Sequence, residues 1–450
     1  MQSWWAGAAE RDGPKYLAIV AALEEAIRSG LLRAGERLPP QRELAISLGV
    51  DLTTVTRAYG LATDSGLIQG AGRLGSFVRN NVDLPAADVE AEGGMIMPPQ
   101  PASALLPDAL RIGMTKLLRA AGQSPLLQYQ PSAGSVRDRR EAAAAFTDRG
   151  IPTQEDDVIV TAGGQSALHA ILATSLSTGD AIAAGQHVYP GLLHLAARLG
   201  LSLIPLSADD EGIDPTAIAA AARAGAQTLY VVPTNDNPTT ATMTARRRHE
   251  VIDMARRHGL TIIEDDAYGL LPSRPPAPLA ALAPDMCWHI ASVSKIISPA
   301  LRVAHVRAPS GISAVQLAAD IYETAIMAPP LNAALVTSWL RDGSFATLVD
   351  AVRAEGVARQ RLAAQHLTAL SYGAHPEGYH LWVDLPDDID AAKVIAATRP
   401  LGLSIVDGAS FAINRARTSA KLRLSLGGSI DHPRLARALD RVVEVATRKG

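Results

Sequence analysis

Lys295 is the residue of this chain best suited to covalent chemistry. It is the only lysine between Lys116 and Lys393, a stretch in which arginine supplies most of the positive charge. Arginine stays protonated, whereas a lysine whose pKa falls on burial can attack an aldehyde and form a Schiff base. Lys295 lies between Ser292 and Arg302 among hydroxyl and apolar residues, a poor site for a solvated charge. We therefore treat it as a candidate nucleophile, with an ordinary surface lysine as the alternative.

A glycine-rich turn supplies a candidate anion site. The β-rich run at residues 158–161 leads into Gly163, Gly164 and Gln165, and a helix is predicted to begin near Ser166. Backbone N–H groups at the N-terminus of a helix favour a bound phosphate. Turns of this kind are also common without any ligand, so the glycines alone are weak support for a phosphate site.

Two further strand ends carry polar side chains. Residues 229–233 lead to Asn237, which stands in an Asn-Pro pair that is also typical of an ordinary turn. Residues 260–263 form an apolar run that ends in three acids, residues 264–266. A carboxylate at this strand end can pair with a ring nitrogen and keep it protonated. A capped helix start would explain the acids equally well.

The elements that position these side chains follow from the alternation of patterns. From Val158 onward, β-rich runs alternate with helical stretches, which predicts a mainly parallel sheet with helices on both faces. Ligands of such sheets bind at the carboxyl ends of the strands, where the polar segments above are expected to meet. The single cysteine, Cys287, excludes an intramolecular disulfide and argues against a cysteine-based metal site, so no metal is predicted.

Residues 12–80 are predicted to form a separate helical unit closed by a hairpin. Leu17, Val20, Leu23 and Ile27 are expected to form the buried face of its first helix, and Asp51 to cap its third. The predicted elements are a helix that ends at Gly30, helices over 41–48 and from 52 to about 65, and strands at 67–69 and 76–79. This order is that of a winged helix-turn-helix, whose third helix enters the major groove of DNA.

Polar side chains of this unit lie at helix starts and in the hairpin loop, where DNA phosphates and bases would be contacted. The candidates are Arg42, Thr53, Thr54, Arg57 and Arg73. Residues 1–80 carry a net charge of only +1, so a small helical bundle that binds nothing is the alternative. A single unit of this kind should bind DNA weakly, which implies a homodimer that contacts two half-sites.

The chain of 450 residues is too long for one hydrophobic core and suggests two or three domains. Residues 81–94 are poor in large apolar side chains, which predicts a flexible linker. Residues 95–450 form the predicted large region, with a smaller C-terminal α+β subdomain from about residue 335. A net charge of −3, without an apolar leader or a run long enough to cross a bilayer, predicts a cytoplasmic protein that does not contact a membrane.

The order of the strand-end segments resembles fold-type I pyridoxal-phosphate enzymes, the aspartate aminotransferase superfamily. The resemblance implies pyridoxal 5'-phosphate as cofactor, with Lys295 as its Schiff-base lysine. The side chains and glycines that would hold the phosphate are Gly163, Gly164, Gln165, Ser292 and Arg302, with Tyr129 in Leu-Gln-Tyr-Gln reaching the phosphate of the neighbouring subunit.

The same resemblance assigns the remaining cofactor contacts. Tyr189 in His-Val-Tyr-Pro-Gly would stack on the ring, while Asn237 and Tyr268 would contact the ring hydroxyl. Asp265 would pair with the ring nitrogen, because it lies three residues before Tyr268. Arg423 in Lys-Leu-Arg-Leu-Ser would bind the carboxylate of the ligand.

Three positions depart from the family pattern. Thr240 and Ala304 stand where glycine is usual, and Gly164 replaces a common serine. None of these changes removes a cofactor contact outright. We expect the two glycine losses to reshape the pocket and Gly164 to offer the phosphate one hydroxyl fewer.

The N-terminal unit resembles the GntR family through Leu-Pro-Pro-Gln-Arg-Glu-Leu-Ala at 38–45 and Gly-Val-Asp-Leu-Thr-Thr-Val-Thr-Arg-Ala-Tyr at 49–59. Its fusion to an aminotransferase-like region resembles the MocR/GabR subfamily of bacterial regulators, over nearly the whole chain. This resemblance implies a homodimeric transcription regulator that binds a double-stranded DNA operator. It also implies that a small amine or amino acid is sensed by aldimine exchange at Lys295, with little or no physiological transaminase turnover.

Two alternatives stay open on the sequence. One is a catalytically active aminotransferase with a DNA-binding appendage, because the lysine that anchors the cofactor is also the proton carrier of transamination. The other is a GntR-type regulator whose large domain binds its ligand without a cofactor. The sequence specifies neither the effector, nor the operator, nor whether transcription is activated or repressed.

Overall fold

The computed structural model describes residues 4–5, 14–28, 31–32, 35–64, 67–70, 75–79, 94–101, 104–120, 125–386, 388–414 and 420–447. The chain forms two compact units, Met1–Val89 and Glu90–Gly450. Apolar side chains are buried within each unit, so the hydrophobic effect stabilises each unit separately. Of the linker predicted at 81–94, only Gly94 is among the described residues.

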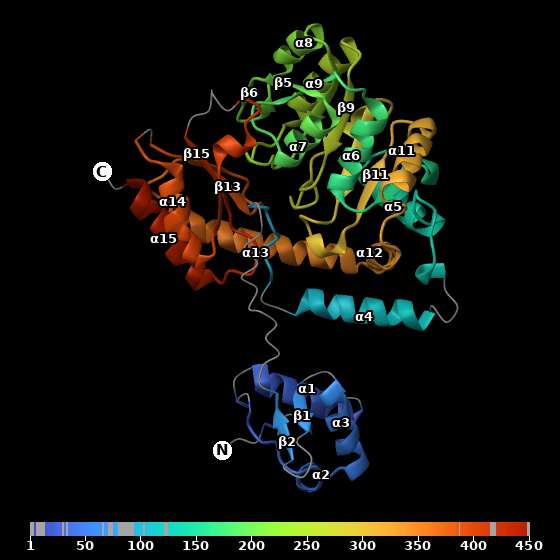
Figure 1. Cartoon of the computed structure of the whole chain (residues 1–450), viewed down its shortest axis with the longest axis vertical. Helices are drawn as coiled ribbons and strands as arrows, with labels where there is room; N and C mark the ends of the chain where they lie inside the picture. Colours follow the sequence, from blue (N-terminus) through green and yellow to red (C-terminus); the bar gives the residue numbers. More distant parts are fainter. Residues whose placement is uncertain are drawn as a thin grey trace. The chain divides into compact units, whose positions relative to one another are not determined.

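The smaller unit contains the predicted helices and hairpin (Figure 1). Its elements are α1 (Lys15–Arg28), α2 (Gln41–Leu48), α3 (Leu52–Asp64) and the antiparallel strands β1 (Ile68–Gly70) and β2 (Ser76–Val78). Gly49 ends α2 in the left-handed conformation that glycine adopts without strain. At the start of α3, Asp51 Oδ1 accepts a hydrogen bond from Thr53 N at 2.7 Å, which confirms the predicted cap. Gly30 lies outside the described residues.

The core of the smaller unit joins α1, α3 and the hairpin. Leu23, Val55 and Ile68 are buried together, and the Tyr59 hydroxyl donates to Pro39 O at 2.8 Å. Leu17 is 48 % exposed, so its predicted place on the buried face of α1 is wrong. The buried face consists of Ile19 and Leu23 with the alanines at 18, 22 and 26, and Leu17 falls beyond its edge.

A seven-stranded sheet forms the centre of the larger unit. In spatial order its strands are β3 (Val158–Thr161), β11 (Ala304–Arg307), β10 (Cys287–Ser292), β9 (Thr261–Asp265), β8 (Ala226–Val231), β4 (Ala181–Gly185) and β5 (Ser202–Leu206). β11 runs antiparallel to both of its neighbours, and the other neighbouring strands pair in parallel. The predicted mainly parallel sheet is therefore confirmed.

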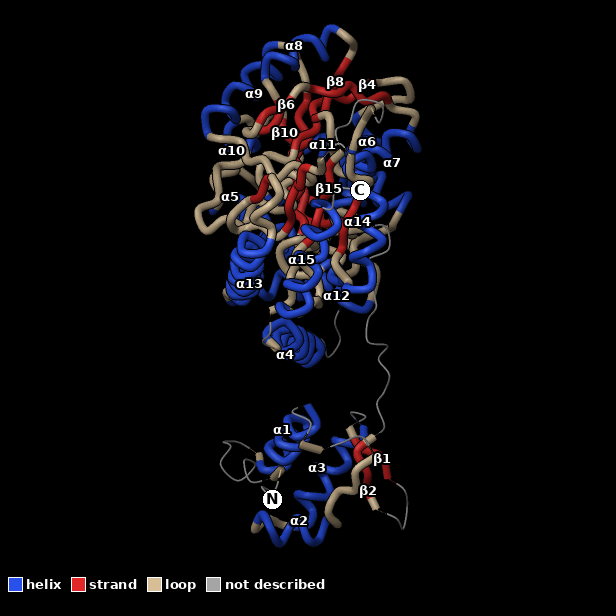
Figure 2. The backbone as a smooth tube through the Cα atoms, turned by 90° about the vertical axis from the view of Figure 1, so that its left-hand side faces the viewer, coloured by secondary structure: helices blue, strands red, loops and turns tan. Residues whose placement is uncertain are grey.

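Helices cover both faces of this sheet (Figure 2). One face packs against α6 (Gly164–Ser175), α7 (Pro190–Leu199) and α11 (Gly311–Thr324). The opposite face packs against α5 (Val136–Asp148), α8 (Pro215–Arg223), α9 (Ala245–Arg257) and the short α10 (Leu279–Leu282). Because both faces are covered, the strands are apolar runs with little alternation, and even Val-Ile-Val-Thr of the edge strand β3 is buried at all four positions.

The C-terminal part forms a second, antiparallel sheet (Figure 1). Its strands, in spatial order, are β12 (Tyr372–Ala374), β13 (His380–Asp384), β15 (Lys421–Ser425) and β14 (Ser404–Asp407), accompanied by α14 (Ala391–Thr398) and α15 (His432–Thr447). The long helix α13 (Ser344–His366) precedes this sheet and packs against both α15 and α12 (Pro330–Asp342). Residue 335, where the C-terminal subdomain was expected to begin, lies within α12. This helix contacts α4 (Leu105–Ala120) and also α5, which packs on the large sheet. Among the described residues, no helix has both the length and the hydropathy needed to cross a bilayer.

Candidate functional site

The loop between β3 and α6 forms a cradle suited to an anion. Gly163 has a φ of +90°, and a Cβ built on it would lie 2.7 Å from Nη2 of Arg302. That nitrogen donates to Ala162 O at 2.8 Å, which fixes the guanidinium against the turn. Because α6 begins at Gly164, the N–H groups of its first turn have no acceptor within the helix. Free N–H groups beside a guanidinium are what a phosphate requires.

Ser292, Gln165 and Tyr189 surround the same turn. A Cβ built on Gly164 would lie 3.4 Å from Cβ of Ser292, the last residue of β10. A Cβ on Gly191 would lie 2.4 Å from Oε1 of Gln165 and 2.2 Å from Cε1 of Tyr189, so the amide and the ring meet at this glycine. Oε1 of Gln165 is buried and has no hydrogen-bond partner within the described part of the chain. It is therefore an acceptor that a ligand can use.

Lys295 lies just beyond β10, in a strongly cationic environment. Burial, and after it the positive charge of Arg423, lowers the pKa of Lys295 to about 8, while Asp265 opposes this change. Its Nζ donates to Ile96 O at 2.6 Å. An amine with a pKa near 8 is partly neutral at physiological pH, which is the form that attacks an aldehyde.

The three acids at the end of β9 differ in their partners. Glu264 is fully buried, accepts from the backbone of Leu279 and Ala280, and contacts His289 Nδ1 at 2.8 Å. Asp265 is less buried and accepts from the Tyr230 hydroxyl at 2.8 Å. Burial raises the pKa of Asp265 to about 6. The carboxylate of Asp265 is thus the one of the three that is open to a ligand beside Lys295.

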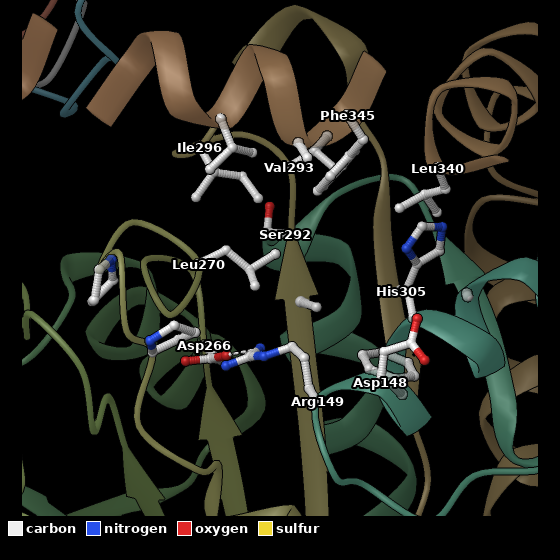
Figure 3. Close-up of a pocket in the computed structure, with 18 of the residues that line it drawn as sticks. Asp148, Arg149, Asp266, Leu270, Ser292, Val293, Ile296, His305, Leu340 and Phe345 are labelled. Carbon is white, nitrogen blue, oxygen red and sulfur yellow. Dashed lines mark hydrogen bonds and ion pairs between the residues drawn. The ribbon is translucent and has the colours of Figure 1, made fainter. Parts of the chain in front are cut away.

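Asp266 faces a separate cavity of about 290 Å³ (Figure 3). Its carboxylate forms an ion pair with Arg149, and although burial opposes ionisation, Arg149 and His289 hold the pKa of Asp266 below its usual value. The cavity lies between α5 and the start of α13, and Ser292 separates it from the glycine turn. This pairing leaves Asp266 unavailable to a cofactor ring.

Asn237, Tyr268 and Arg423 form the opposite wall of the site. Arg423 is 2 % exposed, and its Nη1 donates to Asn237 Oδ1 at 3.4 Å. Burial lowers the pKa of Arg423 to about 10. The Tyr268 hydroxyl is buried without a hydrogen-bond partner among the described residues, and burial raises its pKa well above the usual value. A buried hydroxyl and a buried guanidinium in this state require a polar ligand.

Tyr129 is not part of this cluster within one chain. It lies between the 3₁₀ turn Pro125–Leu127 and α5, and its side chain is 79 % exposed. The contact to a neighbouring subunit that the family resemblance implies therefore stays a prediction. The other predicted cofactor residues line one region at the carboxyl ends of the parallel strands, as the fold requires.

Four of the candidate DNA-binding residues, Arg42, Thr53, Thr54 and Arg57, are among the described residues of the smaller unit. Arg42 and Thr53 are exposed, and Thr54 is half-buried. The Thr53 hydroxyl donates to Asp51 at 2.6 Å, so it already takes part in the cap of α3. The Arg57 guanidinium lies 4.0 Å from the centre of the Tyr16 ring, which holds this side chain against α1. Arg73 lies outside the described residues.

Four residues that contribute to the site were not found in the sequence. Tyr230 donates to Asp265, the Tyr379 hydroxyl donates to Lys295 O at 2.6 Å, and the backbone oxygens of Gly94 and Ile96 accept from Arg423 and Lys295. For Tyr230 a signal existed, because a tyrosine within a buried strand needs a partner for its hydroxyl. The backbone contacts cannot be predicted from residue type, because every residue carries the same carbonyl oxygen.

The match to known families decides what kind of domain carries this site. Residues 102–442 match the family described as aminotransferase class I and II. The chain belongs to this family. Residues 15–78 match the bacterial regulatory proteins of the gntR family. The predicted fusion of a GntR-type helix-turn-helix domain with an aminotransferase domain is therefore confirmed. Aminotransferases of class I and II form a family of pyridoxal-phosphate-dependent proteins.

Relatives with both domains extend over almost the whole chain. The uncharacterized HTH-type transcriptional regulator YdeF of Bacillus subtilis is 27 % identical over 432 residues, covering 94 % of this chain and 92 % of its own. The vitamin B6 salvage pathway transcriptional repressor PtsJ of Salmonella typhimurium is 28 % identical over 418 residues, which cover 92 % of this chain and 95 % of PtsJ. Kynurenine aminotransferase of Pyrococcus horikoshii has the same fold as the larger unit, with a TM-score of 0.71 and 22 % identity. The match covers 79 % of this chain and 89 % of that protein.

Proposed function

We propose that this protein is a MocR-type transcriptional regulator that binds DNA as a homodimer and senses a small amine or amino acid at a pyridoxal-phosphate site. The observation that carries the proposal is the position of Lys295, an amine with a pKa of about 8 between Asp265 and Arg423. The relatives that match both domains are named as regulators, which favours regulation over metabolism as the role of the site.

The residues of the site fit pyridoxal phosphate. When bound, this cofactor supplies an aldehyde that a primary amine can attack. The turn at Gly163, Gly164 and Gln165, with Arg302 and Ser292 beside it, is the proposed phosphate site. The Gly163 cradle supports this role, because a Cβ there would collide with the guanidinium of Arg302.

The remaining contacts are assigned by chemistry. Asp265 is proposed to hold the ring nitrogen, because Glu264 and Asp266 are occupied by His289 and Arg149. Tyr268 is proposed to donate to the ring hydroxyl together with Asn237, since its own hydroxyl is buried without a partner among the described residues. Tyr189 is proposed to stack on the ring.

Arg423 defines the class of effector. A guanidinium that is 2 % exposed and depressed in pKa by burial gains most from an ionised acid, which it can bind through two parallel hydrogen bonds. The effector is therefore proposed to carry an acidic group, which Arg423 would hold, and a primary amine, which would compete with Lys295 for the aldehyde that the cofactor supplies.

The DNA-binding role rests on the smaller unit. Arg42, Thr53, Thr54, Arg57 and Arg73 are the proposed contacts, on α2, α3 and the hairpin loop. Two such units are required for a specific operator, and Tyr129 is proposed to contact the phosphate bound by the partner subunit. Its 79 % exposure in a single chain supports a role at such an interface.

The test is the absorption spectrum of the protein with pyridoxal phosphate, with Lys295→Ala and Lys393→Ala compared with the unchanged chain. Lys393 is an exposed lysine on α14 and serves as the matched control. We expect a visible band at about 420 nm that only Lys295→Ala abolishes. A spectrum without this band in the unchanged protein would remove the cofactor from the proposal. Rapid turnover of amino donors with a 2-oxo acid would instead identify a working aminotransferase.

A further inference from the structure

The segment Gly94–Gln100, here called the strap, crosses the cofactor site. It is the first described part of the chain after the connection between the two units. Its Gly94 O accepts from Arg423 Nη2, and its Ile96 O accepts from Lys295 Nζ at 2.6 Å. In an extended chain, the carbonyls of residues two apart point to the same side. One short stretch of backbone therefore occupies both Arg423, which the proposed function assigns to the effector, and Lys295, which it assigns to the cofactor.

The far end of the strap is anchored beside β15. Gly428 N donates to Pro98 O at 3.1 Å, and Gln100 N donates to Gly428 O at 3.3 Å. The approach is close, because a Cβ on Gly427 would lie 1.7 Å from Met97 O. At the near end, a Cβ on Gly94 would lie 2.1 Å from Cγ2 of Val406, on the strand that pairs with Arg423. Both glycines are needed for the strap to lie where it does.

We infer that the strap is an internal competitor of the effector, which displaces Gly94 from Arg423 when its acidic group binds. This inference rests on the proposed function in one respect, the assignment of Arg423 to the acid. The physical reason is the charge and shape of the acceptor: Gly94 offers one neutral carbonyl oxygen, whereas an ionised carboxylate carries a negative charge and can accept two parallel hydrogen bonds from the guanidinium. Nε of Arg423 is buried without a partner among the described residues, so a carboxylate also satisfies a donor that the strap leaves unused.

Displacement would change the connection between the two units. Release of Gly94–Met97, up to the anchor at Pro98, adds four residues to the chain that joins them, an increase in maximum reach of about 14 Å. A longer tether alters the effective concentration at which two DNA-binding units of a dimer meet two half-sites. The strap thus links occupancy of Arg423 to DNA binding without any other moving part.

Labelling of a cysteine in the strap tests this inference. Ile96 is 2 % exposed and the native Cys287 is fully buried, so in Ile96→Cys a thiol reagent reacts at position 96 only when the strap lifts. Acetate is the probe, titrated in place of chloride at constant ionic strength. We expect the labelling rate to rise saturably by about tenfold or more, because one charge-assisted contact is replaced. Met95→Cys is the control, since its side chain is already 56 % exposed and its rate should not respond.

Variants of the anchors provide a second measurement. In the Ile96→Cys background, Gly94→Ala and Gly427→Ala should each raise labelling in chloride alone, and Val406→Ala added to Gly94→Ala should reverse part of that rise. Arg423→Gln should give fast labelling that acetate no longer changes. Circular dichroism establishes that each variant is folded.

The outcomes separate this inference from the proposed function, because labelling requires neither cofactor nor DNA. An acetate response without a pyridoxal-phosphate band would support the strap and reject the cofactor. A Lys295-dependent band combined with a labelling rate that acetate does not change, or with slow labelling of Gly94→Ala, would overturn the proposed role of the strap and leave the cofactor proposal intact.

Discussion

The Tyr230 hydroxyl lies 2.8 Å from Oδ2 of Asp265, and the two residues come from neighbouring parallel strands, β8 and β9. Burial raises the pKa of Asp265, and this hydrogen bond acts against that rise by stabilising the carboxylate. Tyr230 is itself buried, so its hydroxyl has no water to replace this acceptor. The pair keeps an anion at the place where a ring nitrogen is proposed to bind.

Replacement of Tyr230 by phenylalanine should weaken cofactor binding. Loss of a hydrogen bond to a charged group is expected to cost about 1.5–3 kcal/mol, or about 10- to 100-fold in the dissociation constant of pyridoxal phosphate. Absorbance titration measures the constant, and Tyr322→Phe on the exposed side of α11 is the matched control. Equal affinity in the Tyr230 variant and the unchanged protein would show that Asp265 does not need this partner.

Cofactor affinity should fall as the pH is lowered through about 6, where Asp265 takes up a proton. The sign follows from ionisation: the carboxylate is required to pair with a protonated ring nitrogen, and burial has moved its pKa up into this range. The phosphate of the cofactor titrates in the same range, with a pKa of about 6. Asp265→Asn separates the two effects, because it should retain the phosphate contribution and lose the rest. A variant profile that matches the original in shape would exclude Asp265 as the titrating group.

The folding stability of the cofactor-free protein should show the opposite trend from Asp265. A carboxyl whose pKa is raised from its unfolded value of about 3.9 to about 6 binds more protons when folded, so stability declines as pH rises between these values. Urea unfolding of the unchanged protein and of Asp265→Asn across this window measures the difference. Asp236 titrates in the same window, because burial, and in part the charge of Asp265, raises its pKa to about 6, so both proteins are compared in an Asp236→Asn background. If the two slopes coincide, Asp265 is not protonated as described.

Gly163→Ala should abolish cofactor binding beyond its cost in stability. The new Cβ would have to share space with the Arg302 guanidinium, at 2.7 Å, in a backbone conformation with φ of +90°. Gly179→Ala is a matched control, because Gly179 has a φ of +97° with no atom within 4 Å of its Cβ position. Both variants should lose about 1–2 kcal/mol from backbone strain, but only the first should lose affinity for pyridoxal phosphate. A similar loss of affinity in both would assign it to strain alone.

Arg42→Ala should weaken DNA binding by a similar factor for all sequences and lower the slope of log affinity against log salt by about 1, as expected for one phosphate contact. Arg223→Ala serves as control, because Arg223 is exposed at the end of α8 in the larger unit. Fluorescence anisotropy with the operator region and with unrelated DNA measures both quantities. A loss confined to one sequence would instead indicate that Arg42 contacts a base.

The sequence alone predicted the fold of both units, and most of the candidate site residues that it indicated lie together in the structure. The isolation of Lys295, the glycine turn at residues 163–164 and the acids after β9 are features of residue type and spacing, which local physics links to strand ends and helix starts. It also determined the winged unit, because capping by Asp51 and termination at Gly49 are local interactions. The sequence did not determine the buried face of α1, since alanines do not distinguish buried from exposed positions.

Only the tertiary structure decided which acid is open to a ligand. Alternation along β9 places Glu264 and Asp266 on one side and Asp265 on the other, yet the pattern does not say which side faces Lys295. His289 and Arg149, brought from β10 and the end of α5, occupy the first two and leave Asp265. The strap is the clearest case, because Ile96 and Lys295 are 199 positions apart and meet through a backbone oxygen that every residue carries. Such contacts depend on how the whole chain packs, so they cannot be predicted from the types of the two residues.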